Sequence, residues 1–138
     1  MKSKFQYDDH MDKPCIDLCN AINEIPGLIT NESCSGHGRY DFQIWFRAET
    51  IIGLYIVARA IDRRYGGPAT RMNDKCWSYW ECHVEDTDLT EDPVHFRLTS
   101  NGVQGRMAYS QARKIFANIR QFLDNKKLME MFKISKKE

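Results

Sequence analysis

Seven consecutive residues, from Ser33 to Arg39, carry a thiol, an imidazole, two hydroxyl groups, a guanidinium and two glycines. A cysteine becomes a strong nucleophile when nearby amides or positive charge lower the pKa of its thiol. An imidazole three residues away can then serve as its base or acid. Cys34 and His37 are therefore the candidate catalytic pair. The alternative is that Cys34 packs as a small apolar side chain at the end of a strand, as free cysteine commonly does.

The same segment also has the groups that bind an anion. Glycine lets the backbone approach a ligand closely, and successive backbone amides can form a concave anion site. A phosphate or carboxylate site and an ordinary glycine-rich hairpin turn fit these residues equally well. The segment is not a P-loop, because it lacks the Gly-Lys-Ser/Thr ending and a strand is predicted after it. The predicted ligand-binding residues are Ser33, Ser35, Gly36, Gly38 and Arg39.

The five cysteines and four histidines do not show the two tight ligand pairs that are typical of structural zinc. Cys15 and Cys19 lie one helical turn apart on an apolar helix face, which favours a place in the core. Cys82 and His83 are adjacent, so they would face opposite sides of a strand. We therefore assign no metal ligand, keep structural zinc as an alternative, and expect free thiols in a reducing compartment.

Aromatic and basic side chains share the predicted strands. A sheet face with such side chains can stack nucleic-acid bases, although a helix-covered core with tryptophans at its rim is the commoner arrangement. Arginines on and after the second predicted helix can bind phosphate, but a solvated helix face is the simpler interpretation. The strand residues are Trp45, Trp77, Tyr79, Trp80, Arg47, His95 and Arg97, and the arginines are Arg59, Arg63, Arg64 and Arg71.

Length and composition indicate one globular domain over residues 1–138, with residues 1–11 as a flexible lead-in. The chain is 42% hydrophobic and 28% charged, which is ordinary for a folded domain. Its formal net charge is +1, so any binding to nucleic acid would need a local basic patch. No apolar run approaches the roughly 18 residues that span a bilayer, and no signal peptide is recognisable. We therefore expect a cytoplasmic protein without a membrane partner.

Apolar periodicity and turn residues predict seven elements around the reactive segment. Their order, α-β-β-α-β-β-α, predicts an α+β domain with a small antiparallel or mixed sheet and helices packed on one face. Residues 101–108 would form a loop before the last helix. The predicted helices are 12–25, 49–65 and 110–125, and the predicted strands are 28–33, 40–47, 75–85 and 94–100.

Two of these elements have a predicted buried face. Side chains alternate along the strand 40–47, so Tyr40, Phe42, Ile44 and Phe46 would share one side. The helix 49–65 is expected to bury an apolar stripe at helical spacing. That stripe consists of Ile51, Leu54, Tyr55, Ala58, Ile61 and Tyr65.

Two stretches resemble the start of the tRNA wybutosine-synthesizing protein 3 family. Residues 15–23 resemble its helix ending in Ile-Asn, and the next strand resembles its Thr-x-x-Ser-Cys-Ser-Gly motif. The resemblance implies an α+β domain, S-adenosylmethionine as methyl donor and a modified guanosine in tRNA as substrate. A Ser-Cys-x-Gly-His-Gly turn is also similar to short proteins of phages and bacterial mobile elements. The matching motif residues are Thr30, Ser33, Cys34, Ser35 and Gly36, followed by His37 where the family has arginine.

The leading hypothesis is a small domain that binds a nucleotide-like or other anionic ligand at the turn of residues 33–39. Ser33, Ser35 and the Gly36 amide would hold the ligand, and His37 and Arg39 would neutralise its charge. The resemblance would make the protein methyltransferase-like, with an RNA partner, and leaves open whether it is an enzyme. The alternative is a non-enzymatic interaction module of phage or mobile-element origin, whose exposed aromatic residues contact a partner or a second copy of the chain.

Overall fold

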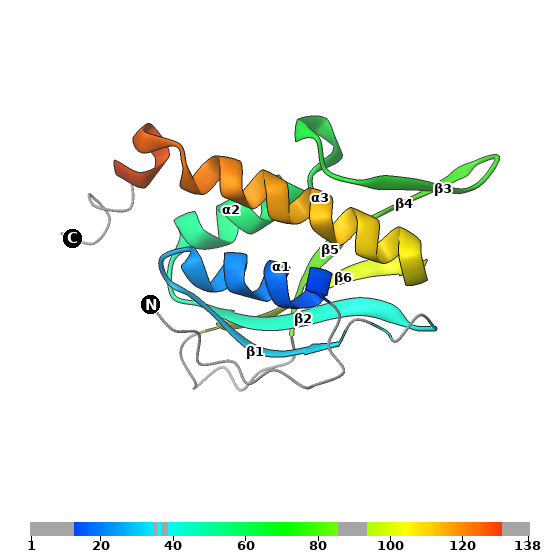
Figure 1. The fold of residues 1–138 in the computed structure, drawn as a ribbon, viewed down its shortest axis with the longest axis horizontal. Coiled ribbons are helices and arrows are strands. Elements are labelled where there is room, and N and C mark those ends of the chain that lie inside the picture. The colour runs from blue at the N-terminus through cyan, green and yellow to red at the C-terminus, as the bar shows by residue number, and fades with distance from the viewer. Residues whose placement is uncertain (1–12, 35, 37–38, 86–93, 131–138) are drawn as a thin grey trace.

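The computed structural model describes residues 13–34, 36, 39–85 and 94–130, with the side chain of Cys34 left out. The elements in chain order are α1 (Lys13–Glu24), β1 (Leu28–Cys34), β2 (Asp41–Ala48), α2 (Ile51–Ile61), the 3-10 helix η2 (Arg63–Tyr65), β3 (Ala69–Asn73), β4 (Cys76–Tyr79), β5 (Glu81–Val84), β6 (Val94–Gln104) and α3 (Gly105–Leu123). Four strands form an antiparallel sheet in the order β1-β2-β6-β5, and β3 and β4 form a separate two-stranded hairpin. In Figure 1 this hairpin projects from the body at the upper right.

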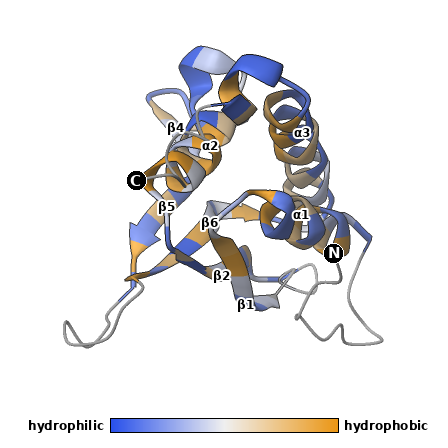
Figure 2. Cartoon of the chain, turned by 90° about the vertical axis from the view of Figure 1, so that its left-hand side faces the viewer, coloured by the Kyte–Doolittle hydropathy of each residue, from blue (hydrophilic) through white to orange (hydrophobic). Residues whose placement is uncertain are grey.

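The α+β class is confirmed, and the three α-helices lie on the same face of the four-stranded sheet (Figure 2). The alternation in β2 buries Phe42, Ile44 and Phe46 completely. The apolar face of α1 packs on β1 and α3 and includes both cysteines. This core arises because the alternating period of β2 and the helical period of α1 place most of their apolar side chains on the side that the partner elements cover.

The predicted buried stripe of the second helix is correct at Ile61 and wrong at Ile51, Tyr55, Ala58 and Tyr65. Ile51 is 86% exposed and Tyr55 is 44% exposed. The segment is apolar almost all round, so its period cannot select one face. The buried face is set instead by the close packing of α2 at Gly53. A Cβ at Gly53 would lie only 2.9 Å from the Pro26 carbonyl oxygen, so this side of the helix must face the Pro26 backbone. The residues that α2 buries are Gly53, Ile56, Val57, Ala60 and Ile61.

The same helix ends earlier than predicted, at Ile61. Asp62 has extended backbone, and its carboxylate accepts a hydrogen bond from the Arg64 amide at 2.9 Å. This cap starts η2, which ends at Tyr65 and is followed by Gly66 in the left-handed region with φ of 93°. The chain therefore turns sharply after α2, and this turn brings Arg63 toward the hairpin.

The single strand predicted over residues 75–85 is divided between two sheets. β4 belongs to the hairpin and β5 to the edge of the four-stranded sheet. Trp80 lies between them, is 3% exposed and donates its indole N–H to Gln111 Oε1 at 2.8 Å. The chain changes sheets here because the side chain of Trp80 enters the core. Strand β3, which pairs with β4, was not predicted.

The loop predicted over residues 101–108 is also wrong. β6 continues to Gln104, and α3 begins at Gly105. An irregularity allows this continuation, since Asn101 and Gly102 have φ of 52° and 92°. Asp41 on β2 fixes it by accepting the Gly102 amide at 2.9 Å.

Candidate functional site

The turn between β1 and β2 is partly described. Ser35, His37 and Gly38 lie outside the described residues, and the backbone of Cys34 pairs with Gln43 at the end of the β1–β2 ladder. Gly36 is buried with φ of 86°, and a Cβ there would lie 3.1 Å from the Asp41 carbonyl oxygen.

Two backbone amides of this turn already have a partner. The amides of Arg39 and Tyr40 both donate to the Gly36 carbonyl at 2.9 Å. These two amides are therefore committed to the turn itself, while the Arg39 side chain is exposed. What the described residues offer an anion here is the Arg39 guanidinium.

Ser33 lies beside the two cysteines of α1 rather than in open solvent. Its hydroxyl oxygen is shielded from solvent, and it interacts with the Cys19 thiol. The hydrogen bond with Cys15 is the main cause that raises the pKa of Cys19 well above its usual value; burial and the charge of Cys15 add to it, and Ser33 opposes it. Cys15 and Cys19 are fully buried, as predicted, and Cys19 stays a protonated thiol at neutral pH.

The described residues contain no group of three or more His, Cys, Asp or Glu side chains arranged to hold a metal ion. His83 instead contacts Glu81, with Nε2 and Oε1 2.9 Å apart. Burial raises the pKa of Cys82 to about 11. A thiol with that pKa is neutral and a poor nucleophile near pH 7.

The aromatic and basic residues noted in the sequence separate into three places. Trp80 is in the core, Trp77 and Tyr79 are on the hairpin, and Trp45 lies on the sheet face opposite the helices, which we call the open face. On the open face Trp45 pairs with Arg97, whose Nε and Nη1 donate to Glu85 at 2.5 Å and Gln43 at 2.9 Å.

Charge on the open face does not favour an anion. The cross-strand register places three glutamates there and two arginines. Arg97 is paired with Glu85, and Glu32 lies directly opposite Trp45. The charged residues of this face are Glu32, Glu81, Glu85, Arg47 and Arg97.

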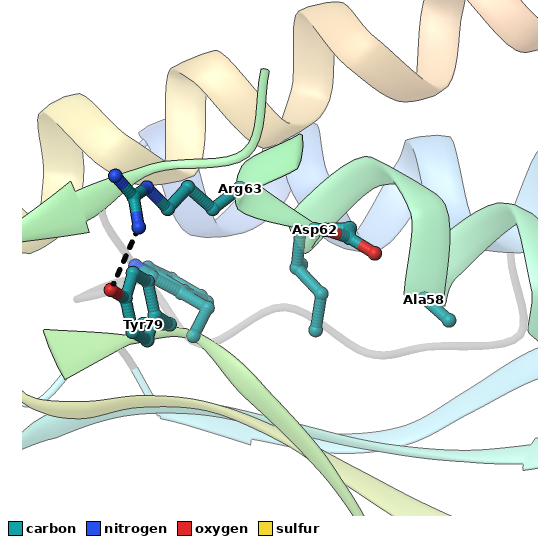
Figure 3. Close-up of a pocket in the computed structure, with 6 residues that line it drawn as sticks. Ala58, Asp62, Arg63 and Tyr79 are labelled. Atoms are coloured by element: carbon teal, nitrogen blue, oxygen red, sulfur yellow. Dashed lines mark hydrogen bonds between the residues drawn. The ribbon is translucent and has the colours of Figure 1, made fainter. Parts of the chain in front are cut away.

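A second place combines an arginine, aromatic rings and a cavity. Figure 3 shows Arg63 reaching from η2 to Tyr79 on β4, with a hydrogen bond of 3.3 Å from Nη1 to the phenol oxygen. The Arg63 guanidinium also lies 5.8 Å from the ring centres of both Trp77 and Tyr79. The adjoining open cavity, which we call the hairpin groove, has a volume of about 410 Å³. It is lined by Ala58, Ile61, Asp62, Arg63, Tyr79 and Trp80.

Three neighbouring arginines near the groove have different partners. Arg59 is held in place, with its guanidinium 3.8 Å above the Tyr65 ring and Nη1 donating to Tyr55 at 2.6 Å. Arg64 forms a two-pronged pair with Asp62 at 2.8 and 3.2 Å, which lowers the pKa of that carboxyl. Arg63 has no carboxylate partner among the described residues. Of these three arginines, Arg63 is the one that lines the groove, so its charge faces a ligand there.

Sequence reasoning identified the residue types of the hairpin groove and missed the site. Arg63 was assigned to a solvated helix face, and Trp77 and Tyr79 to a longer strand. The available signal was the sequence Gly66-Gly67-Pro68, which ends the helical segment and redirects the chain. Its consequence, the meeting of Arg63 with Tyr79, depends on a hairpin that the pattern did not predict.

None of three comparisons, with protein-family models, with curated proteins and with solved structures, finds a match to this chain. No helix in the described parts of the chain combines the length and apolar character required to cross a bilayer.

Proposed function

We propose that this protein binds a nucleotide-like, phosphate-bearing ligand and that the hairpin groove receives it. The observation that carries the proposal is Arg63, a guanidinium without a carboxylate partner among the described residues, which donates to the Tyr79 hydroxyl at the mouth of a cavity. A guanidinium presents five N–H donors in a fork that matches a phosphate. Only one of them is engaged in the hydrogen bond to Tyr79.

The other groove residues suit the remainder of a nucleotide. Aromatic faces such as that of Tyr79 stack on bases of any type. The volume of about 410 Å³ is within the usual range for small-molecule sites. Asp62 supplies carboxylate oxygens at the wall, which can accept hydrogen bonds from an amino group or a ribose hydroxyl.

Titration of the protein with AMP, GMP and inorganic phosphate tests the proposal, with calorimetry as the readout. We expect Arg63→Ala to weaken nucleotide binding by about tenfold to a hundredfold, because hydrogen bonds to a charged group are lost. Arg39→Ala removes the same charge from the turn predicted by sequence and is expected to change affinity less than twofold.

The two variants together decide where an anion binds. A loss of binding in Arg39→Ala with full binding in Arg63→Ala would overturn the groove assignment and favour the turn of residues 33–39. S-adenosylmethionine, titrated in parallel, tests the ligand that the resemblance implies. Binding of none of these compounds would contradict the proposed function altogether.

One observation favours a second function, that of an interaction module. α2 leaves an apolar stripe on its outer side, formed by Ile51, Tyr55 and Ala58, and large apolar side chains left in water often mark contact sites. If this stripe joins two copies of the chain, light scattering will show a dimer that Ile51→Lys dissociates. A monomer at high protein concentration would contradict this function. Ile51 is 86% exposed, so the substitution should leave the fold intact.

A further inference from the structure

Positive charge is concentrated in the part of the chain that forms η2 and the hairpin. Residues 62–79 contain four basic and two acidic side chains, a net charge of +2, whereas the whole chain carries +1. The remainder of the chain is therefore slightly negative. Arg64 is paired with Asp62 and Arg71 lies 3.9 Å from Asp74 at the tip of the hairpin, so Arg63 and Lys75 are the basic groups of this surface without a carboxylate partner among the described residues.

Two aromatic side chains follow each other on the same side of β4. Trp77 and Tyr79 are alternate residues of one strand, so their side chains stand roughly 7 Å apart on one face. Both lie beside Arg63. Arg71 on β3 is the cross-strand partner of Trp77, which places a further cation next to the outer aromatic residue.

Trp77 lies outside the groove and is not needed to line it. It is 48% exposed, although a tryptophan without a partner normally buries its large apolar surface. A mononucleotide would fill the groove against Tyr79 and would leave Trp77 uncovered. The surface formed by Arg63, Tyr79 and Trp77 therefore extends further than a single nucleotide would cover.

We propose that the ligand of the hairpin groove is a single strand of nucleic acid. One nucleotide would occupy the groove, with its base at Tyr79 and its phosphate at Arg63. The strand would continue over β4, with the next base stacked on Trp77 and its backbone near Arg71 and Lys75. This inference rests on the proposed function, since it uses the same groove and the same arginine.

The chemistry favours a single strand over a duplex. Stacking on an aromatic side chain requires an exposed base face, and the bases of a duplex cover each other's faces. Binding through stacking and phosphate contacts is insensitive to sequence and is weakened by salt. The open face of the sheet is disfavoured for the same strand, because its glutamates outnumber its arginines.

Fluorescence anisotropy tests the inference with labelled oligouridylate and oligothymidylate of about 12 nucleotides, and with a duplex of the same length. We expect the single strands to bind at least tenfold more tightly than AMP or GMP binds. Trp77→Ala should weaken oligonucleotide binding by about fivefold or more while leaving AMP and GMP binding unchanged, and Trp77→Phe should restore most of the affinity.

Two further measurements exclude a merely structural effect. Trp45→Ala removes a tryptophan from the open face and should leave oligonucleotide affinity within twofold of the wild type. Lys75→Gln should reduce the slope of log affinity against log salt by about 0.7, the value for one phosphate contact with a single strand.

Each failure has a distinct meaning. If AMP or GMP binds through Arg63 but the oligonucleotides bind no more tightly, the inference is wrong and the proposed function stands. If the duplex binds as tightly as the single strands, stacking on Trp77 is excluded. A larger loss in Trp45→Ala than in Trp77→Ala would move the strand to the open face and overturn the inference. If neither nucleotides nor oligonucleotides bind, the proposed function fails as well.

Discussion

Replacement of Trp80 by alanine is expected to lower the free energy of unfolding by about 3 to 5 kcal/mol, the usual cost of removing a buried tryptophan. Trp80 is 3% exposed, and its ring centre lies 5.4 Å from that of Phe42. Its indole N–H donates to Gln111 on α3. The substitution would therefore leave a cavity between the sheet and α3 and remove a hydrogen bond across the same boundary.

Urea denaturation followed by far-UV circular dichroism measures this loss without relying on tryptophan fluorescence. Trp77→Ala is the matched control, because the same side chain is removed from a position that is 48% exposed. We expect that control to cost at most about 1 kcal/mol. Equal losses in the two variants would show that Trp80 does not join the hairpin to the core in the way described. Most domains have a free energy of unfolding of only about 5 to 15 kcal/mol. Trp80→Ala should therefore shift the urea midpoint of unfolding to a much lower urea concentration.

The second large effect is expected at Gly67. A Cβ at this position would lie 2.2 Å from the carbonyl carbon and oxygen of Ile61, which are backbone atoms that cannot rotate away. The Gly67 amide also donates to the Asp62 carbonyl at 2.8 Å, so the turn is held close. We expect Gly67→Ala to destabilise the fold by about 2 to 3 kcal/mol, as overpacking of a tight site does.

The neighbouring glycine separates this steric effect from a general effect of adding a methyl group. Gly66 has φ of 93°, but a Cβ there would meet nothing within 4 Å. Gly66→Ala should therefore cost only the strain of the left-handed backbone, about 1 kcal/mol. Thermal and urea unfolding of both variants measure the difference. The close contact at Gly67 would be refuted if Gly66→Ala were the more destabilising of the two.

Gly67→Ala should also affect the hairpin groove. Relief of the clash requires the end of α2 and η2 to move apart, and Arg63 belongs to η2. We therefore expect reduced nucleotide binding in this variant even at temperatures where it remains folded, while Gly66→Ala keeps most of its affinity. This outcome would connect the local geometry of the turn with the position of the guanidinium.

The elements that the sequence predicted well are those with one regular period. α1 has a clear helical period and β2 a clear alternation. Their buried residues were predicted correctly because burial follows the period, except for Tyr40, which precedes β2 and is 63% exposed. α2 has no such contrast, so the sequence could not choose its face. The close contact of Gly53 with Pro26 and Thr50 determines which face of α2 is buried. The amino-acid sequence pattern does not reveal a contact of this kind.

The two candidate sites also differ in how far the sequence alone could indicate them. The turn of residues 33–39 could be proposed from the sequence because its reactive side chains are consecutive there. The hairpin groove requires Arg63 and Tyr79, which are 16 residues apart, to meet. Their meeting depends on the cap at Asp62, the close turn at Gly67 and the change of sheet at Trp80. Each of these is a tertiary event, so periodicity alone could not indicate the groove.

The two ends of the β3–β4 hairpin lie next to each other where the hairpin joins the rest of the protein. Ala69 and Tyr79 are its first and last paired residues, so their Cα atoms are only about 5 Å apart. Pro68 and Trp80 are therefore close enough to be joined by a short turn, at the loss of the hydrogen bonds that Ser78 makes with the Asn101 carbonyl and Thr70 with Gln111. The hairpin could therefore be exchanged for another one between these two ends. Hairpins of other lengths and charges that keep Thr70, Ser78 and Tyr79 could be placed between these two residues to change what the groove accepts.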